Sequence, residues 1–336
     1  MAAVDRSVTE LMATVFADYR AEHAEPVPGD PQLWRTLEDL GLVRLTGSAS
    51  RGGSGAGWPE AAELLRAAAA HGVRAPLAEH DLLACWLLDE VGIEPDGARR
   101  TVCLLDDDAT ATGVPWLSRC DRAVLVWRRG GKWRVTDAAV ANLTVEPGEN
   151  LAGEPRDRVT ADLGIFPGVS APDELIDRLL LRGALARAVQ VCAVLDRIVE
   201  LTVQHASERT QFGRPLTKFQ AVQHLVVDAA AEAGLARAAT DAALTEAVRT
   251  GWADPQLEFR IAAARSCAGH AVSTVVRNAH QVHGAIGTTR EHQLHEFTTP
   301  ALAWRSEFGS VRHWDELLTD LATGAGRREL WPLVCS

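Results

Sequence analysis

The 336-residue sequence lacks any apolar run that approaches the roughly 20 residues of a membrane-spanning helix. Its first residues, Met1 to Arg6, also lack the charged and apolar regions that make up a signal peptide. We therefore expect no membrane partner and a cytoplasmic location.

A surplus of basic residues is also missing. The chain has 34 lysines and arginines against 45 aspartates and glutamates, which gives a formal net charge of −11. Nucleic-acid binding depends on a basic surface that displaces counterions from the phosphate backbone. The charge therefore argues against nucleic acid as the main partner, although a few arginines could still hold a phosphorylated ligand.

The cysteines contain no C-x-x-C pair, so neither a zinc site nor a disulfide framework is expected. We predict reduced and mostly buried thiols. The six cysteines are Cys85, Cys103, Cys120, Cys192, Cys267 and Cys335.

A complete di-iron motif is absent as well. The segment 291–296 holds two glutamates and two histidines, but a di-iron bundle needs Glu-x-x-His on two helices and no second copy exists. We expect no metal site. We expect His80, His205 and His224 on helix faces or at helix caps.

The composition is that of an ordinary globular protein, with 47% hydrophobic and 24% charged residues. Residues 7–97 show helical spacing of apolar side chains, for example at Leu33, Trp34 and Leu37. A glycine-rich segment, 47–57, interrupts this pattern. It is no P-loop, because neither Lys-Ser nor Lys-Thr follows the glycines.

The middle of the chain changes to β-prone runs at 101–105, 123–127 and 132–135, with a hairpin signal at Gly130-Gly131. From Ser170 the helical spacing returns, and four long helices follow, which predicts an antiparallel four-helix bundle. We predict a mainly α protein with a helical domain (1–97), a small β domain (98–165) and a bundle domain (166–336).

The segment 208–220 is the most informative part of the sequence. It reads E-R-T-Q-F-G-R-P-L-T-K-F-Q and joins two predicted helices through a turn at Gly213 and Pro215. An arginine, an amide and two aromatic rings meet there, which suits a phosphate-bearing cofactor. A second block, 281–294, follows about 70 residues later and reads Q-V-H-G-A-I-G-T-T-R-E-H-Q-L. Its glycines allow backbone N–H groups to approach a ligand.

The two blocks resemble the R-x-Q-F-G-x-P-L-x-x-F-Q and Q-x-x-G-G-x-G-x-x-x-E-x-P-L motifs of the acyl-CoA dehydrogenase family, with Ala285 and Gln293 as departures. In that family the blocks bind the pyrophosphate and adenine end of FAD from a neighbouring subunit. The resemblance implies an acyl-CoA dehydrogenase-like fold with an abbreviated β domain. It also implies ten FAD-contacting residues, namely Arg209, Gln211, Phe212, Phe219, Gln220, Gln281, Val282, His283, Gly284 and Ala285.

Other family features are missing. The T-E-P-x-x-G-S-D and K-x-x-I-T-N segments that lie beside the flavin ring do not occur. Alignment without gaps places Phe308 at one family position of the catalytic base and Gly183 at the other. Glu307 lies one residue before the first position and is the candidate base, the alternative being a surface glutamate.

The resemblance implies a subunit of a flavin-dependent enzyme that introduces an α,β double bond into an acyl-CoA substrate. It is most like the shortened subunits of actinobacterial heteromeric acyl-CoA dehydrogenases of steroid degradation, which predicts a second acyl-CoA dehydrogenase-like subunit in an α2β2 assembly. Two alternatives stay open. One is a self-sufficient homo-oligomer that uses Glu307 as base, and the other is a structural homologue that has lost FAD.

Overall fold

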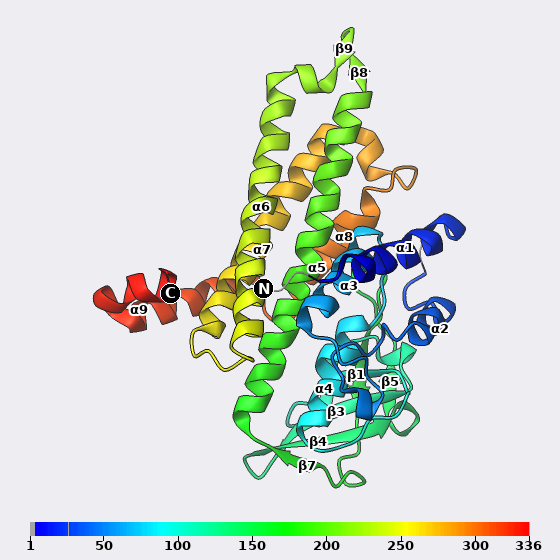
Figure 1. Cartoon of the computed structure of the whole chain (residues 1–336), viewed down its shortest axis with the longest axis vertical. Coiled ribbons are helices and arrows are strands. Elements are labelled where there is room, and N and C mark those ends of the chain that lie inside the picture. The colour runs from blue at the N-terminus through cyan, green and yellow to red at the C-terminus, as the bar shows by residue number, and fades with distance from the viewer. Residues whose placement is uncertain (1–3, 26, 336) are drawn as a thin grey trace. The chain divides into compact units, whose positions relative to one another are not determined.

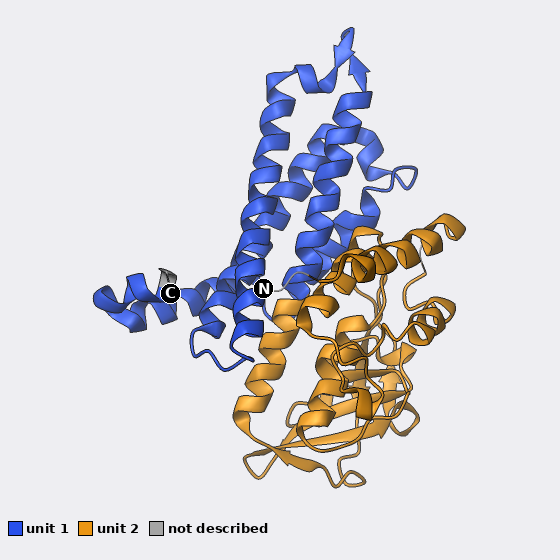
Figure 2. Ribbon diagram, in the orientation of Figure 1, with its two compact units in different colours: residues 1, 187–336 blue, residues 2–186 orange. Residues whose placement is uncertain are grey.

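The computed structural model describes residues 4–25 and 27–335, with side chains up to residue 333. The expectations for Met1 and for the Cys335 thiol lie outside this described part. The chain divides into two compact units, an amino-terminal unit that ends at Ala186 and a carboxyl-terminal unit that begins at Arg187 (Figure 2). Within the described residues, no helix combines the length and the apolar character needed to cross a membrane.

The amino-terminal unit begins with short helices, as the apolar spacing predicts. Aspartates cap the first two: Asp5 accepts a hydrogen bond from the Ser7 N–H and Asp30 from the Gln32 N–H. The glycine-rich segment lies outside the α-helices, between α2 and α3. The helices are α1 (Arg6–Glu22), α2 (Pro31–Asp39), α3 (Trp58–Ala70), a π-helical segment (Ala78–Cys85) and α4 (Trp86–Glu90).

The small β module of the same unit has two sheets, ordered β1-β3-β4-β7 and β2-β6-β5. Only the β1–β3 pair is parallel. Gly130 and Gly131 have φ of +60° and +75°, as a two-residue hairpin turn between β3 and β4 requires. The strands are β1 (Arg100–Leu104), β2 (Thr110–Pro115), β3 (Arg122–Arg129), β4 (Lys132–Ala139), β5 (Thr144–Glu146), β6 (Arg156–Thr160) and β7 (Val169–Ala171).

Three short strand runs were predicted in this module, and each occurs within a longer or slightly shifted strand. Strand β7 lies beyond the predicted domain boundary at residue 165, so the strand-forming region extends past that position. The module's core is apolar and includes Leu125 and Trp127, both almost fully buried. Four of the five described cysteines are buried, as the prediction of mostly buried thiols requires.

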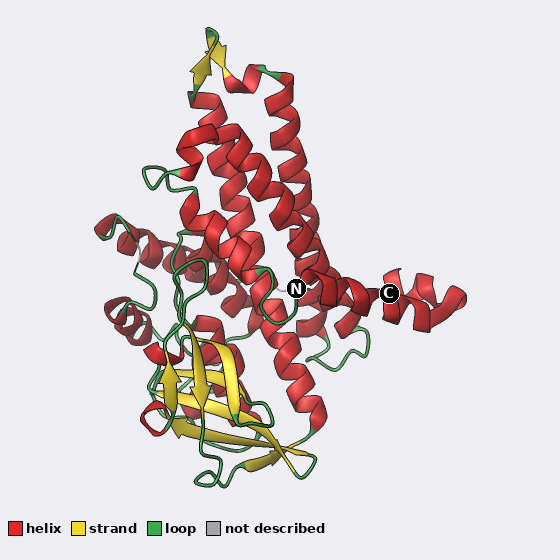
Figure 3. Cartoon of the chain, turned by 180° about the vertical axis from the view of Figure 1, so that it is seen from behind, coloured by secondary structure: helices red, strands yellow, loops and turns green. Residues whose placement is uncertain are grey.

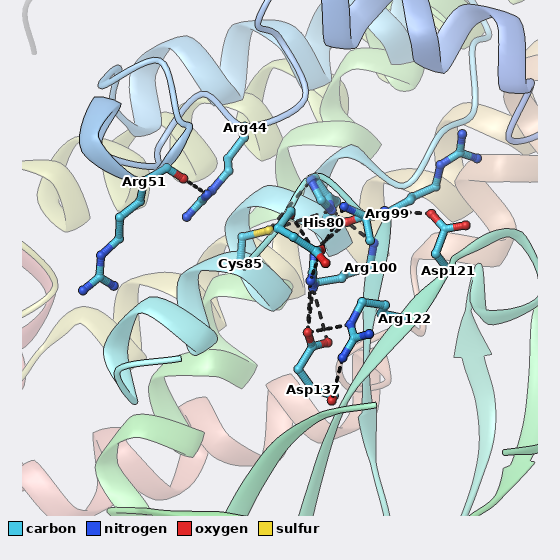
Figure 4. Close-up of polar contacts among 11 residues, drawn as sticks. Arg44, Arg51, His80, Cys85, Arg99, Arg100, Asp121, Arg122 and Asp137 are labelled. Atoms are coloured by element: carbon cyan, nitrogen blue, oxygen red, sulfur yellow. Dashed lines mark hydrogen bonds and ion pairs between the residues drawn. The ribbon is translucent and has the colours of Figure 1, made fainter. Parts of the chain in front are cut away.

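A buried charge network joins strands β1, β3 and β4 (Figure 4). The Arg100 guanidinium is 1% exposed and lies 3.0 Å from the Asp137 carboxylate, which also receives a 2.7 Å hydrogen bond from Arg122. The backbone N–H of Arg100 donates a hydrogen bond to His80 Nδ1 at 3.1 Å. Burial, and after it the nearby Arg100 charge, lowers the pKa of His80 to about 3. His80 therefore accepts a hydrogen bond on the buried face of the π-helical segment, so of the two predicted places it occupies a helix face and not a helix cap.

The carboxyl-terminal unit is helical apart from one small hairpin (Figures 1 and 3). Helix α7 packs against α6 and α9, and small side chains such as Ala229, Ala233 and Ala236 form the buried face of α6. The elements are α5 (Asp173–Glu208, which starts in the amino-terminal unit), β8 (Thr210–Gln211), β9 (Arg214–Pro215), α6 (Gln220–Arg249), α7 (Leu257–His283), α8 (His295–Trp304) and α9 (Val311–Cys335).

We expect Arg100→Ala to lower the free energy of unfolding by about 3 kcal/mol, because it leaves buried carboxylate charge with less compensation. Urea denaturation measures the change. The matched control is Arg6→Ala, whose side chain is 91% exposed and pairs only with exposed Glu10. This control should change stability by less than about 0.5 kcal/mol. Equal effects of the two substitutions would contradict the assigned role of the buried network.

Candidate functional site

The first motif block forms the hairpin that reverses the chain between α5 and α6. Phe212 and Gly213 are the two central residues of its turn and have φ of +50° and +77°. Both values are positive, which is the requirement of a type I′ turn. This conformation is costly for a bulky side chain such as Phe212, yet that ring is 92% exposed. The turn thus presents a large apolar ring to solvent at the end of the helix pair.

Phe219 packs against two residues of this hairpin, Arg214 and Phe212. The Arg214 guanidinium lies 4.2 Å from the Phe219 ring centroid, within the range of a cation–π contact. Phe212 meets the same ring edge-on, with 6.2 Å between the centroids. The two aromatic rings of the motif are therefore in contact with each other.

A cavity of about 660 Å³ lies where the first motif block meets the second. Its walls come from the end of α5, the start of α6 and the end of α7, so segments about 70 residues apart in sequence share one site. Seven of the ten predicted cofactor residues line it and three do not. The lining residues among them are Arg209, Gln211, Gln281, Val282, His283, Gly284 and Ala285, and the others are Phe212, Phe219 and Gln220.

The chemistry of this cavity suits an anionic ligand. Arg209 is exposed and, among the described residues, its guanidinium has no acidic partner. Gly284 has φ of +64° and open space where a Cβ would stand, so the backbone can approach a ligand closely. The amides of Gln211 and Gln281 are exposed beside them. The Arg209 guanidinium, the two glutamine amides and the exposed backbone at Gly284 are suited to bind the pyrophosphate-bearing part of a dinucleotide.

Three histidines gather at the edge of the same cavity. His205 and His283 line it, and His292 lies against both, although the three come from different segments of the chain. His205 lies on helix α5, as predicted, but its grouping with His283 and His292 was not predicted. No spacing along the chain could have indicated the group, because α5, α7 and the loop before α8 meet only in the folded chain.

Glu307, the candidate base, is held in an ion pair. Arg187 Nε donates to Glu307 Oε2 at 2.6 Å, and the arginine side chain is 2% exposed. The Glu307 side chain is 17% exposed. Because its charge is compensated by a buried cation, accepting a proton from a substrate would leave Arg187 buried without that partner.

A second arginine fixes the backbone that carries Glu307. Arg265 is 1% exposed and donates to the backbone carbonyls of Trp304, Arg305 and Glu307 at 3.3, 3.0 and 2.8 Å. Burial, and after it the Arg187 charge, lowers the pKa of Arg265 to about 10, which leaves it protonated at neutral pH. The loop shift that would carry Glu307 to the family position of the base has to break these bonds.

The two family positions of the base carry no carboxylate. One is Phe308, which has φ of +55°, and the other is Gly183. Next to Gly183, the Arg182 guanidinium lies 4.0 Å from the Trp86 ring centroid, and its Nε donates to the Leu82 carbonyl at 2.9 Å. An arginine stacked on a tryptophan can hold charge or pack, but it cannot remove a proton from a substrate.

Comparison with known proteins shows that this chain is similar to acyl-CoA dehydrogenases. Residues 174–310 match the family model of the acyl-CoA dehydrogenase carboxyl-terminal domain. Acyl-CoA dehydrogenase IpdE2 from Mycobacterium tuberculosis is 29% identical over 309 residues, covering 85% of this chain and 88% of IpdE2.

Solved structures extend the likeness to almost the whole chain. A chain of the ChsE4–ChsE5 complex from Mycobacterium tuberculosis is 19% identical, with 94% of this chain and 96% of that chain covered and a TM-score of 0.83. A chain of the Tcur3481–Tcur3483 steroid ACAD is 22% identical, with 96% and 98% covered and a TM-score of 0.81. At such identities the likeness concerns the fold, and the predicted mainly α fold of acyl-CoA dehydrogenase type is confirmed.

We expect Glu307→Gln to lower the free energy of unfolding by about 2 to 3 kcal/mol, because Arg187 stays buried after losing an ionic partner. Urea denaturation of the purified chain measures this. Glu291→Gln serves as the matched control, since Glu291 is exposed, and should stay within about 0.5 kcal/mol of the unaltered chain. Unchanged stability of the Glu307 variant would mean that the ion pair is not structural and would leave this carboxylate available as a base.

Proposed function

The chain belongs to the acyl-CoA dehydrogenase family, and from this premise we propose that it is one subunit of a heteromeric, FAD-dependent enzyme that forms an α,β double bond in an acyl-CoA. The observation that carries this proposal is an asymmetry within the chain. Seven of the ten residues that the resemblance assigns to FAD line one cavity, whereas the family positions of the base carry no carboxylate.

When bound, FAD would supply the redox chemistry by accepting the substrate's β-hydride. The chain's own residues would bind and orient it. Arg209 would pair with a pyrophosphate oxygen, and the amides of Gln211 and Gln281 would donate further hydrogen bonds. The open backbone at Gly284 would let the ligand lie against the end of α7. In the family these blocks serve the flavin of a neighbouring subunit, which agrees with their exposure in the single chain.

The proton acceptor would come from the partner subunit. Removal of the substrate's α-proton requires a carboxylate within hydrogen-bond reach, and a displacement of one residue is enough to prevent it. Glu307 is paired with Arg187, and the loop that carries it is bonded to Arg265. The occurrence of the ChsE4–ChsE5 complex among the structural neighbours supports an assembly of two different subunits.

A steroid-derived acyl-CoA is the substrate class that we favour. The support is the similarity in fold to the Tcur3481–Tcur3483 steroid ACAD. The alternative of a self-sufficient homo-oligomer needs Glu307 to act as the base. The ion pair between Glu307 and Arg187 argues against this alternative. A structural homologue without FAD would have no use for the arginine and amides that line the cavity.

We expect Arg209→Ala to weaken FAD retention by the chain and its partner about tenfold or more, because a hydrogen bond to a charged group contributes about 1.5 to 3 kcal/mol. Flavin content after gel filtration and a titration with FAD measure the loss. Arg312→Ala is the matched control, because Arg312 is an exposed arginine that pairs with Glu316 on its own helix. Normal flavin content in the Arg209 variant would contradict the assignment of the cavity.

Purification with and without the partner tests the heteromer directly. We expect flavin absorbance and acyl-CoA-dependent reduction of an electron acceptor only when the chain is co-expressed with an acyl-CoA dehydrogenase-like partner. A chain that alone is yellow and reduces the acceptor would overturn the heteromer in favour of the homo-oligomer. Absence of flavin both with and without the partner would favour the structural homologue.

A further inference from the structure

We propose that His205, His283 and His292 bind a divalent transition-metal ion such as Zn²⁺ at the edge of the cavity. The three residues lie near the end of α5, at the end of α7 and in the loop before α8. One ring nitrogen from each lies within 4.8 Å of the other two. Imidazole is a preferred ligand of zinc, and three histidines are a known ligand set for it.

His283 carries the inference furthest. Its side chain is 5% exposed, and its Nδ1 lies 2.7 Å from the Ala279 carbonyl oxygen. A carbonyl only accepts hydrogen bonds, so Nδ1 bears the proton and Nε2 bears a lone pair. That Nε2 is buried and finds no hydrogen-bond partner in the described part of the chain. A metal-binding histidine typically has this arrangement, with the second ring nitrogen donating to a backbone carbonyl.

The rings of His205 and His292 lie against the His283 ring, and neither makes a hydrogen bond to its Nε2. His205 stacks on His283 with 4.4 Å between centroids, and neither of its ring nitrogens has a hydrogen bond to a described residue. His292 meets His283 edge-on at 4.7 Å. Packing alone would explain three rings in contact. It does not explain why the buried His283 Nε2 is left without a hydrogen-bond donor among the described residues, since a buried polar atom without a partner is destabilising.

Two adjustments would complete the site. Zinc–nitrogen bonds of about 2.0 to 2.1 Å bring tetrahedral ligands to about 3.4 Å from one another, so the rings must rotate inward. His292 Nδ1 accepts a 3.1 Å hydrogen bond from the Leu294 N–H, and this neutral bond would be given up. Three protein ligands leave the fourth position for water or a ligand atom. His205 and His283 line the cavity, so that position is reachable from it.

Metal titration of the full chain tests the proposal without any need for flavin or substrate. The chain is stripped with a chelator and titrated with Zn²⁺ by calorimetry, and with Co²⁺ by its visible absorption, which reports tetrahedral nitrogen ligands. We expect one ion per chain. His205→Gln and His292→Gln, which replace partly exposed rings, should each weaken binding at least tenfold. His224→Gln is the matched control, an exposed histidine outside the cluster, and should bind as the unaltered chain does.

The outcomes separate a site from packing. Absence of stoichiometric binding by the unaltered chain overturns the proposal, and so does unaltered affinity in both variants. His283→Gln is left out of the test, because it could disturb the buried end of α7. Circular dichroism checks that each of the other variants is folded. The flavin proposal is independent of this result, since the chain could bind a metal without retaining FAD and could retain FAD without a metal.

Discussion

The reversal of the chain between α5 and α6 is the constraint on which the candidate site depends. Two helices of 36 and 30 residues are joined by a hairpin whose central residues both need positive φ. Gly213 adopts this conformation readily, whereas Phe212 does so at a cost. The reversal places Arg209 beside the start of α6. Helix α7, packed along the alanine-rich face of α6, then brings the second motif block back to the same end. The cavity forms because α5 and α7 end there and α6 begins there.

Buried arginines decide what this chain can do chemically. Arg187 and Arg265 are almost fully buried, and a buried guanidinium is stable only with acceptors around it. The Glu307 carboxylate and three backbone carbonyls provide these acceptors. The arrangement that stabilises the loop therefore also engages the carboxylate of Glu307 in an ion pair. This pairing is the ground on which we propose that the base comes from a partner subunit.

The helices could be predicted from the sequence because their alanine-rich, apolar spacing is long and regular. The four long helices predicted after Ser170 correspond to α5, α6, α7 and α9, whereas the shorter α8 was not predicted. The short strands β2, β5, β6 and β7 were not predicted, because their exposed, polar faces give a weak periodic signal. The ion pair of Glu307 could not be predicted either, since Arg187 lies 120 residues away. The histidine cluster could not be predicted for the same reason, because its members meet only in the folded chain.

The carboxyl-terminal unit bears two costs that nothing else in the described chain offsets. Phe212 adopts an unfavourable backbone conformation and exposes an aromatic ring. The Nε2 lone pair of His283 is buried without a donor. Each cost is removed by a different addition: an apolar surface for the ring and a cation for the lone pair. Both lie at the same end of the α5–α6 pair as Arg209, whose exposed guanidinium can pair with an anion. A homologue kept only as a scaffold would gain stability by losing the two costs, which agrees with a site completed by ligands.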